Sequence, residues 1–483
     1  MPASGSRRYL ILAVCCMSLL IVGLDNTIVN VALPSIRRDL HASVSGLQWT
    51  VAAYTLVLAS LLMLSGSAAD RIGRRRVFQT GLVTFTAGSL LCSLAPSLGW
   101  LIAFRMVQAV GGSMLNPVAM SIITNTFTDR AERARAIGVW GGVIGISMAL
   151  GPVVGGVLVA SVGWRGIFWV NVPIGLAAVV LAGLFVPESR AARPRRFDPV
   201  GQVLVMTILG SLTYGIIEGP GAGWASPEII FFFTLAAAAL LALVRYEPRR
   251  DEPLIDLRFF RSVPFSGATV IAVSAFAALS GFLFLNTLYL QDVRGFSALH
   301  AGLYTLPMAA MTVIFGPLSG RLVASRGARL PLLLAGLGLT AGCALLTGLT
   351  DTTSATWLFA AYIIFGFGFG IVNAPITNAA VSGMPVAQAG VAAAVASSSR
   401  QVGQSLGVAV VGSAVTSGLH GSLRASFTAA SHVGWWMLVG CGALVFAFAV
   451  ITTGRWALGT AARAAGRLES GEPGQARTPV PAP

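Results

Sequence analysis

The sequence predicts an all-α polytopic membrane protein with 14 transmembrane helices, and its composition and hydropathy pattern are the basis of that prediction. Of the 483 residues, 55% are hydrophobic and only 10% are charged, and the mean hydropathy is +0.80. A soluble domain usually carries about 25% charged residues. Apolar runs of roughly 20 residues, the length that crosses a bilayer as a helix, recur along the whole chain.

Each expected span is an apolar run bounded by Arg, Gly or Pro. The spans are placed at residues 9–33, 49–69, 77–95, 100–122, 136–160, 166–186, 199–218, 228–245, 264–289, 299–319, 330–348, 356–380, 391–416 and 433–453. Arg-containing loops at 187–198 and 246–263 bracket one pair of spans, and removing that pair leaves six helices on each side.

This arrangement predicts a duplicated architecture with a two-helix insert. The expected parts are an N-terminal six-helix bundle at 1–190, a two-helix insert with flanking cytoplasmic loops at 191–260, a C-terminal six-helix bundle at 261–455, and a disordered cytoplasmic tail at 456–483.

The basic residues indicate how the chain lies in its membrane. The net charge is +15, and all 32 basic residues are Arg. They fall in short loops rather than on one amphipathic face, so nucleic acid is not an expected partner. If the N-terminus is cytoplasmic, most loop arginines lie inside, as the positive-inside rule requires. We therefore expect a multi-pass protein of the cytoplasmic membrane with both termini in the cytoplasm. The five cysteines lie in apolar runs without metal-ligand spacing, so no metal site is expected.

Asp25 is the acid placed most clearly inside the hydrocarbon. Insertion of an Asp at the centre of a span costs about 2.5–3.5 kcal/mol, which makes it a functional candidate. Asp25 lies about eight residues, or roughly 12 Å, from the outer end of its span, and Arg105 about five residues, or roughly 8 Å. The two side chains can pair if the first and fourth spans are neighbours. Alternatively, Arg105 snorkels to the outer surface.

Other embedded polar residues leave two interpretations open. They either line a cavity or bond between helices, and they are Asn26, Asn30, Gln108 and Asn116. Glu218 ends the seventh span, where it is either an interfacial acid in water or a second protonation site.

Two glycine-containing strings suggest moving parts. In GSAADRIGRRR (66–76), small residues allow helices to approach, Gly73 permits a tight turn, and Asp70 can cap a helix or pair with an Arg. The glycines of GPVVGG (151–156) give a flat helix face, and Pro152 weakens one backbone hydrogen bond.

These strings resemble those of the major facilitator superfamily. The string 66–76 is similar to its cytoplasmic signature loop, which implies a conformational latch formed by Gly66, Asp70, Arg71, Gly73 and Arg74. The string LIAFRMVQAVGG (101–112) resembles the fourth-helix motif, whose Arg is tied to proton coupling; it has Ala109 where the family usually has Gly. The fifth-helix string resembles the motif of exporting antiporters, which implies that role for Gly151, Pro152, Gly155 and Gly156.

Further strings narrow the resemblance to the 14-helix drug:proton antiporters of the EmrB/QacA type. They are LDNTIVNVALP (24–34), WRGIFWVNVPIG (164–175), YLQ (289–291) and RQVG (400–403). The resemblance implies the major facilitator fold, with two six-helix bundles plus two inserted helices. It also implies proton coupling through Asp25 and Arg105.

The expected function is proton-coupled efflux of small amphiphilic or cationic compounds such as drugs or antibiotics. The expected partners are this substrate, protons and the lipid bilayer, and the protein is expected to act as a monomer. The proton gradient replaces any cofactor, because no Gly-x-x-x-x-Gly-Lys nucleotide loop is present. An enzyme is not expected, since no catalytic set of residues clusters in the sequence. The alternative is proton-coupled uptake of a polar metabolite by the same fold.

Overall fold

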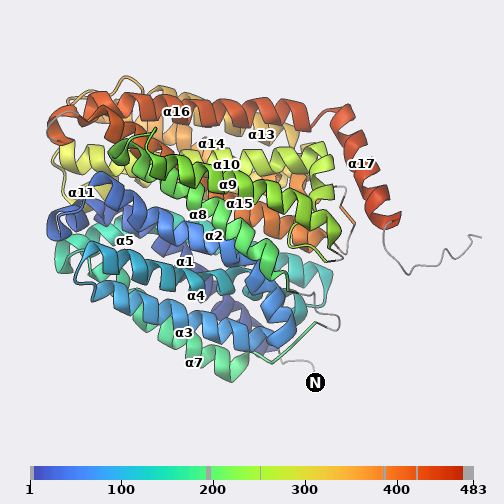
Figure 1. Ribbon diagram of the computed structural model, residues 1–483. Coiled ribbons are helices and arrows are strands. Elements are labelled where there is room, and N and C mark those ends of the chain that lie inside the picture. The colour runs from blue at the N-terminus through green and yellow to red at the C-terminus, as the bar shows by residue number, and fades with distance from the viewer. Residues whose placement is uncertain are drawn as a thin grey trace, which may run out of the picture.

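The computed structural model describes residues 5–191, 197–250, 252–382, 384–385, 388–419 and 423–470. Within these ranges the chain is helical and contains no strand. Most of the helices run side by side along one common direction, and the helix at the C-terminal end lies at an angle to them (Figure 1). This arrangement follows from the composition, because a helix satisfies its own backbone hydrogen bonds inside a bilayer.

The first half of the chain forms one group of packed helices. They are α1 (Gly5–Leu40), α2 (Val44–Ile72), α3 (Arg74–Ser93), α4 (Leu98–Thr126), α5 (Arg130–Val162), α6 (Gly166–Trp169) and α7 (Asn171–Phe185). Helix α4 packs against α2 and α3, and α1 packs against α5 and α7. These are the blue to blue-green helices of Figure 1.

Two helices lie in the region of the expected insert. Helices α8 (Pro199–Ala222) and α9 (Pro227–Tyr246) pack against each other, and α8 also contacts α2 and α15. Two short 3-10 turns follow, η1 (Glu247–Arg249) and η2 (Leu257–Arg261). Residues 192–196 and 251 of the flanking loops lie outside the described residues.

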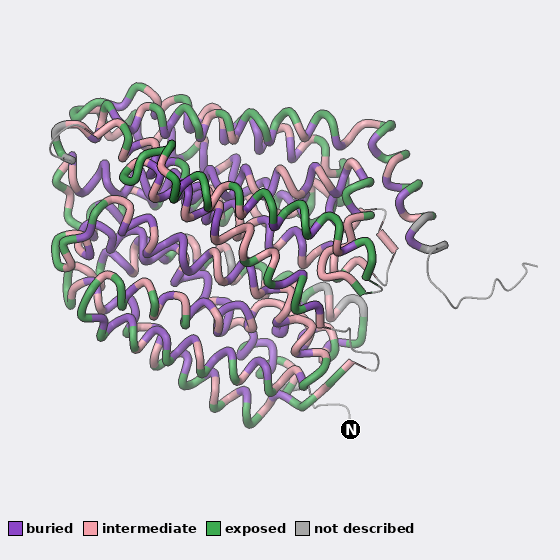
Figure 2. Tube along the Cα trace, in the orientation of Figure 1, coloured by how far each residue is buried: buried purple, intermediate pink, exposed green. Residues whose placement is uncertain are grey.

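The remaining helices form a second group. They are α10 (Val263–Leu288), which continues as the π-helical turn η3 (Tyr289–Val293), α11 (Ala298–Tyr304), α12 (Leu306–Arg326), α13 (Arg329–Ala344), α14 (Ala355–Val381), α15 (Ala389–Gly418) and α16 (Leu423–Thr452). Helix α14 lies between α12 and α13, and α10 packs against α15 and α16. Buried residues concentrate in the inner helices, while the outermost helices are largely exposed (Figure 2).

The two groups touch along two seams. Helix α5 contacts α11 and α12, and α2 contacts α15. Helices α1 and α10 also meet. At one seam, Nε2 of Gln48 on α2 donates to the carbonyl oxygen of Ala409 on α15 at 2.8 Å.

The number of apolar spans is lower than the expected 14. In the part of the chain that the structure describes, ten helical segments are long and apolar enough to cross a membrane, or eleven if the bent α5 is one span. Helices α3, α13 and α15 lie outside that count. Helix α3 begins with three arginines, α13 has only 16 residues, and α15 carries many Ser, Gly and Gln residues. These three helices lie where the spans at 77–95, 330–348 and 391–416 were expected, but they are too polar or too short to be counted as apolar spans.

The C-terminal tail is partly ordered, contrary to the expectation of disorder from 456 onward. Helix α17 (Arg455–Ser470) contacts α10 and η2. One face of α17 is buried and consists of Ala457, Ala461, Ala464 and Leu468. This helical spacing, together with the high helix propensity of Ala, explains the helix. Residues 471–483 lie outside the described residues.

Candidate functional site

A buried polar network lies at the centre of the first helix group, and Asp25 is its hub. Helix α1 supplies Asp25, α3 supplies Ser89, α4 supplies Arg105 and Gln108, and α7 supplies Asn171. All five side chains are buried, with 0% of Asp25 and 1% of Arg105 exposed. Four helices therefore converge on one carboxylate that has no contact with solvent.

Each oxygen of Asp25 has a hydrogen-bond donor. Nη1 of Arg105 donates to Oδ2 in a short ion pair. Oδ1 accepts from Nε2 of Gln108 at 2.9 Å and from Nδ2 of Asn171 at 3.1 Å. The same two amides donate to Oγ of Ser89, at 2.6 and 3.1 Å. The pair expected between Asp25 and Arg105 is thus present and direct, and Arg105 does not reach the surface.

Arg105 also has partners besides the carboxylate. Its Nε donates to the carbonyl oxygen of Thr50 at 3.3 Å, and its Nη1 donates to Oε1 of Gln108 at 2.8 Å. Its guanidinium carbon lies 4.1 Å from the centre of the Tyr54 ring. A buried ion pair stabilises a fold only if such additional bonds satisfy its remaining groups. This network meets that condition for both charges.

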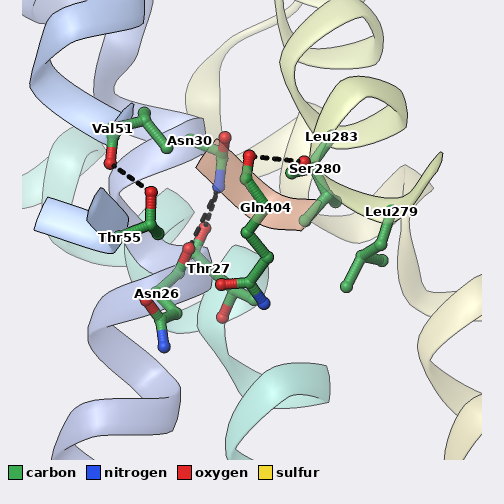
Figure 3. A pocket seen from close by; sticks show the side chains of 9 residues that line it. All are labelled: Asn26, Thr27, Asn30, Val51, Thr55, Leu279, Ser280, Leu283 and Gln404. Atoms are coloured by element: carbon green, nitrogen blue, oxygen red, sulfur yellow. Dashed lines mark hydrogen bonds between the residues drawn. The ribbon is translucent and has the colours of Figure 1, made fainter. Parts of the chain in front are cut away.

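A small cavity lies beside the network, between the two helix groups (Figure 3). Its empty volume is about 300 Å³, counting the part that is open to solvent. The lining residues are Asn26, Thr27 and Asn30 of α1, Val51 and Thr55 of α2, Leu279, Ser280 and Leu283 of α10, and Gln404 of α15. This lining combines amides and hydroxyls with the apolar side chains of Val and Leu, and it contains no charged side chain.

The cavity separates the predicted polar residues into two sets. Asn26 and Asn30 line it, which agrees with one of their two interpretations. Gln108 does not line it: it is completely buried in the Asp25 network, because its amide can donate to the carboxylate there. Asn116 of α4 does not line it either, and its buried Oδ1 has no hydrogen-bond partner within the described residues.

The glycines of α5 let this helix approach α1 closely. A Cβ at Gly151 would lie 1.9 Å from Oγ1 of Thr27, and a Cβ at Gly155 would lie 2.8 Å from the side chain of Ile28. Thr27 also lines the cavity and is two residues from Asp25. The antiporter-like string therefore fixes the position of α1 at the level of the candidate site.

The same stretch of α5 packs against α11 of the second group. A Cβ at Gly156 would lie 2.7 Å from the backbone of Leu299, and a Cβ at Gly302 would lie 2.3 Å from the carbonyl oxygen of Pro152. The two parts of α5, Arg135–Met148 and Leu150–Val162, are bent by 42° relative to each other. Pro152 contributes to the bend because it cannot donate to the carbonyl of Met148. The two groups are closed against each other at the α11 end.

The predicted latch residues surround the turn between α2 and α3. Gly73 has a φ of +129°, a conformation that favours glycine. Oδ1 of Asp70 accepts from Nη2 of Arg74 at 2.8 Å. The carboxylate of Glu188, which follows α7, accepts from the backbone N–H of Arg75 at 3.1 Å. A Cβ at Gly73 would lie 2.6 Å from that carboxylate.

Within the described residues, the latch string contacts the first group and the chain segment that follows α7. Gly66 faces Pro117 of α4 at 3.9 Å, and the guanidinium of Arg71 lies 5.2 Å from the Phe197 ring. Sequence reasoning did not find Glu188, because an acid in a loop is usually solvated.

Glu218 and Asn171 differ in their relation to the Asp25 network. Glu218 is half-buried and accepts from Nε1 of Trp49 at 2.6 Å, so it lies in a specific contact away from the Asp25 network. Asn171 was not predicted as a site residue. It lies inside the string 164–175, and that resemblance was the available signal for it.

Comparison with known proteins gives consistent matches. The family model described as Major Facilitator Superfamily matches residues 15–408. Multidrug resistance protein Stp of Mycobacterium tuberculosis is 38% identical over 413 residues, which cover 84% of this chain and 76% of that protein. The tetracenomycin C resistance and export protein of Streptomyces glaucescens is 37% identical over 415 residues, which cover 85% and 77%.

A solved structure shows the same fold. It is a bacterial homologue of the human lysosomal transporter Spinster, in an inward-facing and occupied conformation. Its TM-score is 0.65 at 18% sequence identity, and the match covers 96% of this chain and 97% of that chain.

Proposed function

Because the chain belongs to the Major Facilitator Superfamily, we propose that it exports amphiphilic drugs or antibiotics in exchange for protons. Membership makes the protein a transporter rather than an enzyme. The direction of transport rests on relatives that are named for multidrug resistance and for resistance and export. These names do not favour the alternative, uptake of a polar metabolite.

The observation that supports proton coupling is the place of Asp25 relative to the cavity. Asp25 is sealed inside the first helix group, whereas the next residue of α1, Asn26, lines the cavity between the groups. A change in the bonding of Asp25 therefore acts on the same turn of helix that meets the substrate. Proton binding and substrate binding therefore both involve the turn of α1 that contains Asp25 and Asn26.

The coupling cycle follows from the bonds of Asp25. In the ionised state the carboxylate accepts from Arg105, Gln108 and Asn171, which ties α1 to α4 and α7. Protonation removes the charge that Arg105 compensates and weakens these bonds. Arg105 keeps the Thr50 carbonyl, the Gln108 oxygen and the Tyr54 ring as partners, so it remains in place. Helix α1 is then free to shift against α5 and α10.

We extend the proposal to the whole architecture. Helices α3, α13 and α15, added to the eleven apolar spans, give the 14 helices of the EmrB/QacA type. On this view α8 and α9 are the insert between two six-helix bundles, and both termini are cytoplasmic. The protein works as a monomer in the cytoplasmic membrane, surrounded by lipid and without a cofactor other than the proton gradient.

The proposal is tested with Asp25→Asn. The variant keeps the side-chain volume and can accept a hydrogen bond, but it cannot exchange a proton. We expect the variant to be expressed, because Arg105 keeps its bonds to Thr50 and Gln108. We also expect loss of drug tolerance in a pump-deficient host and loss of efflux driven by a pH gradient in inverted vesicles. Asp39→Asn is the matched control, because Asp39 is on the same helix but half-exposed at its end. Full pH-driven efflux by Asp25→Asn would refute the coupling role.

A further inference from the structure

One arginine in the middle of a helix of the second group forms no ion pair within the described residues. This residue is Arg400 on α15. Within the bounds of α10, α14 and α15 it is the one charged residue (Asp, Glu, Lys or Arg). Ion pairs within the described residues do not include it. A charge inside a membrane helix without a countercharge is expensive, and such residues usually serve a function.

The neighbours of Arg400 are uncharged. Its Nη2 donates to Oγ1 of Thr377 on α14 at 2.5 Å, and its Nη1 donates to Oγ of Ser397 at 3.4 Å. The ring of Phe276 on α10 lies 5.9 Å from its guanidinium carbon. The Nε atom is buried and has no partner within the described residues. The guanidinium therefore keeps an unused donor and its full positive charge.

Arg400 points along the same face of α15 as a residue of the cavity. Gln404 lines the cavity and follows Arg400 by four residues, which is one helical turn or about 6 Å along the axis. Thr377, which accepts from Arg400, is exposed. Arg400 is half-buried and thus lies one helical turn from a cavity residue, beside the exposed side chain of Thr377 on α14.

No acid among the described residues forms an ion pair with Arg400. Asp25, the nearest acid in sequence to the cavity residues of α1, is completely buried and already paired with Arg105. The cavity itself offers amides and hydroxyls, and Figure 3 shows Asn26, Asn30 and Gln404 converging from α1 and α15. Oδ1 atoms of Asn26 and Asn30 are buried without a partner within the described residues.

We propose that Arg400 binds an ionised acidic group of the substrate, such as a carboxylate or phenolate, while the cavity amides bind its neutral polar groups. This proposal rests on the proposed export function and names its substrate class. A planar guanidinium is suited to an anionic oxygen group. The sequence left cationic compounds among the expected substrates. An uncompensated Arg beside an uncharged cavity selects against them, because bringing two like charges together is unfavourable.

The test compares two planar dyes of opposite charge, the phenoxazine anion resorufin and the benzophenoxazine cation cresyl violet. Binding to the purified full-length protein in detergent is measured by fluorescence anisotropy. We expect the wild type to bind resorufin more tightly than cresyl violet. Arg400→Gln should weaken resorufin binding about tenfold or more, because a charge-assisted hydrogen bond is lost. Its affinity for cresyl violet should stay equal or rise.

Two further variants make the result specific. Arg400→Lys keeps the charge and should retain most of the preference for resorufin. Arg463→Gln removes an exposed arginine on α17 and should change neither affinity. An equal loss of both dyes in Arg400→Gln, a preference of the wild type for cresyl violet, or no resorufin binding would each overturn the assignment. Drug tolerance in the pump-deficient host, measured in parallel, tests export itself. Tolerance without a resorufin preference would therefore refute only the charge assignment.

Discussion

Asp25 and Arg105 form a pair whose value to the protein depends on both partners being present. Each is buried, and each has neutral bonds in addition to the ion pair. Removing one partner of a buried pair leaves the other charge uncompensated, which typically destabilises a protein by about 3–5 kcal/mol. The intact pair therefore adds little to the net stability of the fold, whereas loss of either partner alone lowers that stability strongly.

This reasoning predicts the outcome of a double-variant experiment. Arg105→Gln should lower the apparent melting temperature of the purified protein strongly, because the buried Asp25 loses its charged partner and must remain ionised without a countercharge or take up a proton. Adding Asp25→Asn to that variant removes the unpaired charge and should recover part of the loss. Thermal unfolding in detergent measures both. Equal melting temperatures for the single Arg105→Gln variant and the double variant would show that the two charges do not stabilise each other.

Helix α5 is the element that joins the two groups at the α11 end. Its glycines meet α1 on one side and α11 on the other, with backbone atoms as the neighbours of Gly156. Backbone cannot move aside as a flexible side chain can. The contact is therefore sensitive to the volume of any side chain added at Gly156. Separation of α5 from α11 is the movement that would open this end.

We predict that Gly156→Val forces this end open. Its Cβ would lie 2.7 Å from the backbone of α11, so α5 and α11 must separate. Spin labels are attached at positions 160 and 300 of a variant that lacks the native cysteines. Double electron–electron resonance should then give a longer distance between the labels in Gly156→Val than in the parent protein. Gly141→Val is the matched control on the same helix, because a Cβ there meets nothing within 4 Å. An unchanged distance in Gly156→Val would contradict the predicted separation of α5 and α11.

For the whole molecule, the sequence predicted those features that can be recognised within a single helix. Apolar runs located most helices, because a helix is the structure that satisfies backbone bonds in lipid. Asp25 and Arg105 stood out because charges are rare there. Asn171 could not be recognised in this way, since it lies 146 residues from Asp25 and is an ordinary polar residue until packing brings it close. The closed state of the α11 end likewise depends on packing between distant glycines.

The unpaired charge of Arg400 has an electrical consequence for the complete transport cycle. If one proton enters while one monovalent anion leaves, two elementary charges move in the same electrical sense. Each is worth roughly 2.3 kcal/mol at 100 mV, so an inside-negative voltage drives both halves of the exchange. A cationic substrate would instead make the exchange electrically neutral.

Voltage alone should therefore power export of an anion, even at equal pH on both sides. In proteoliposomes with a potassium gradient clamped by valinomycin, resorufin should accumulate on the electrically positive side, and reversing the gradient should reverse the accumulation. Asp25→Asn should abolish it if exchange is obligatory. Accumulation that ignores the sign of the voltage would contradict this charge balance. The arginine that selects the substrate would thus also set which component of the proton-motive force drives its expulsion.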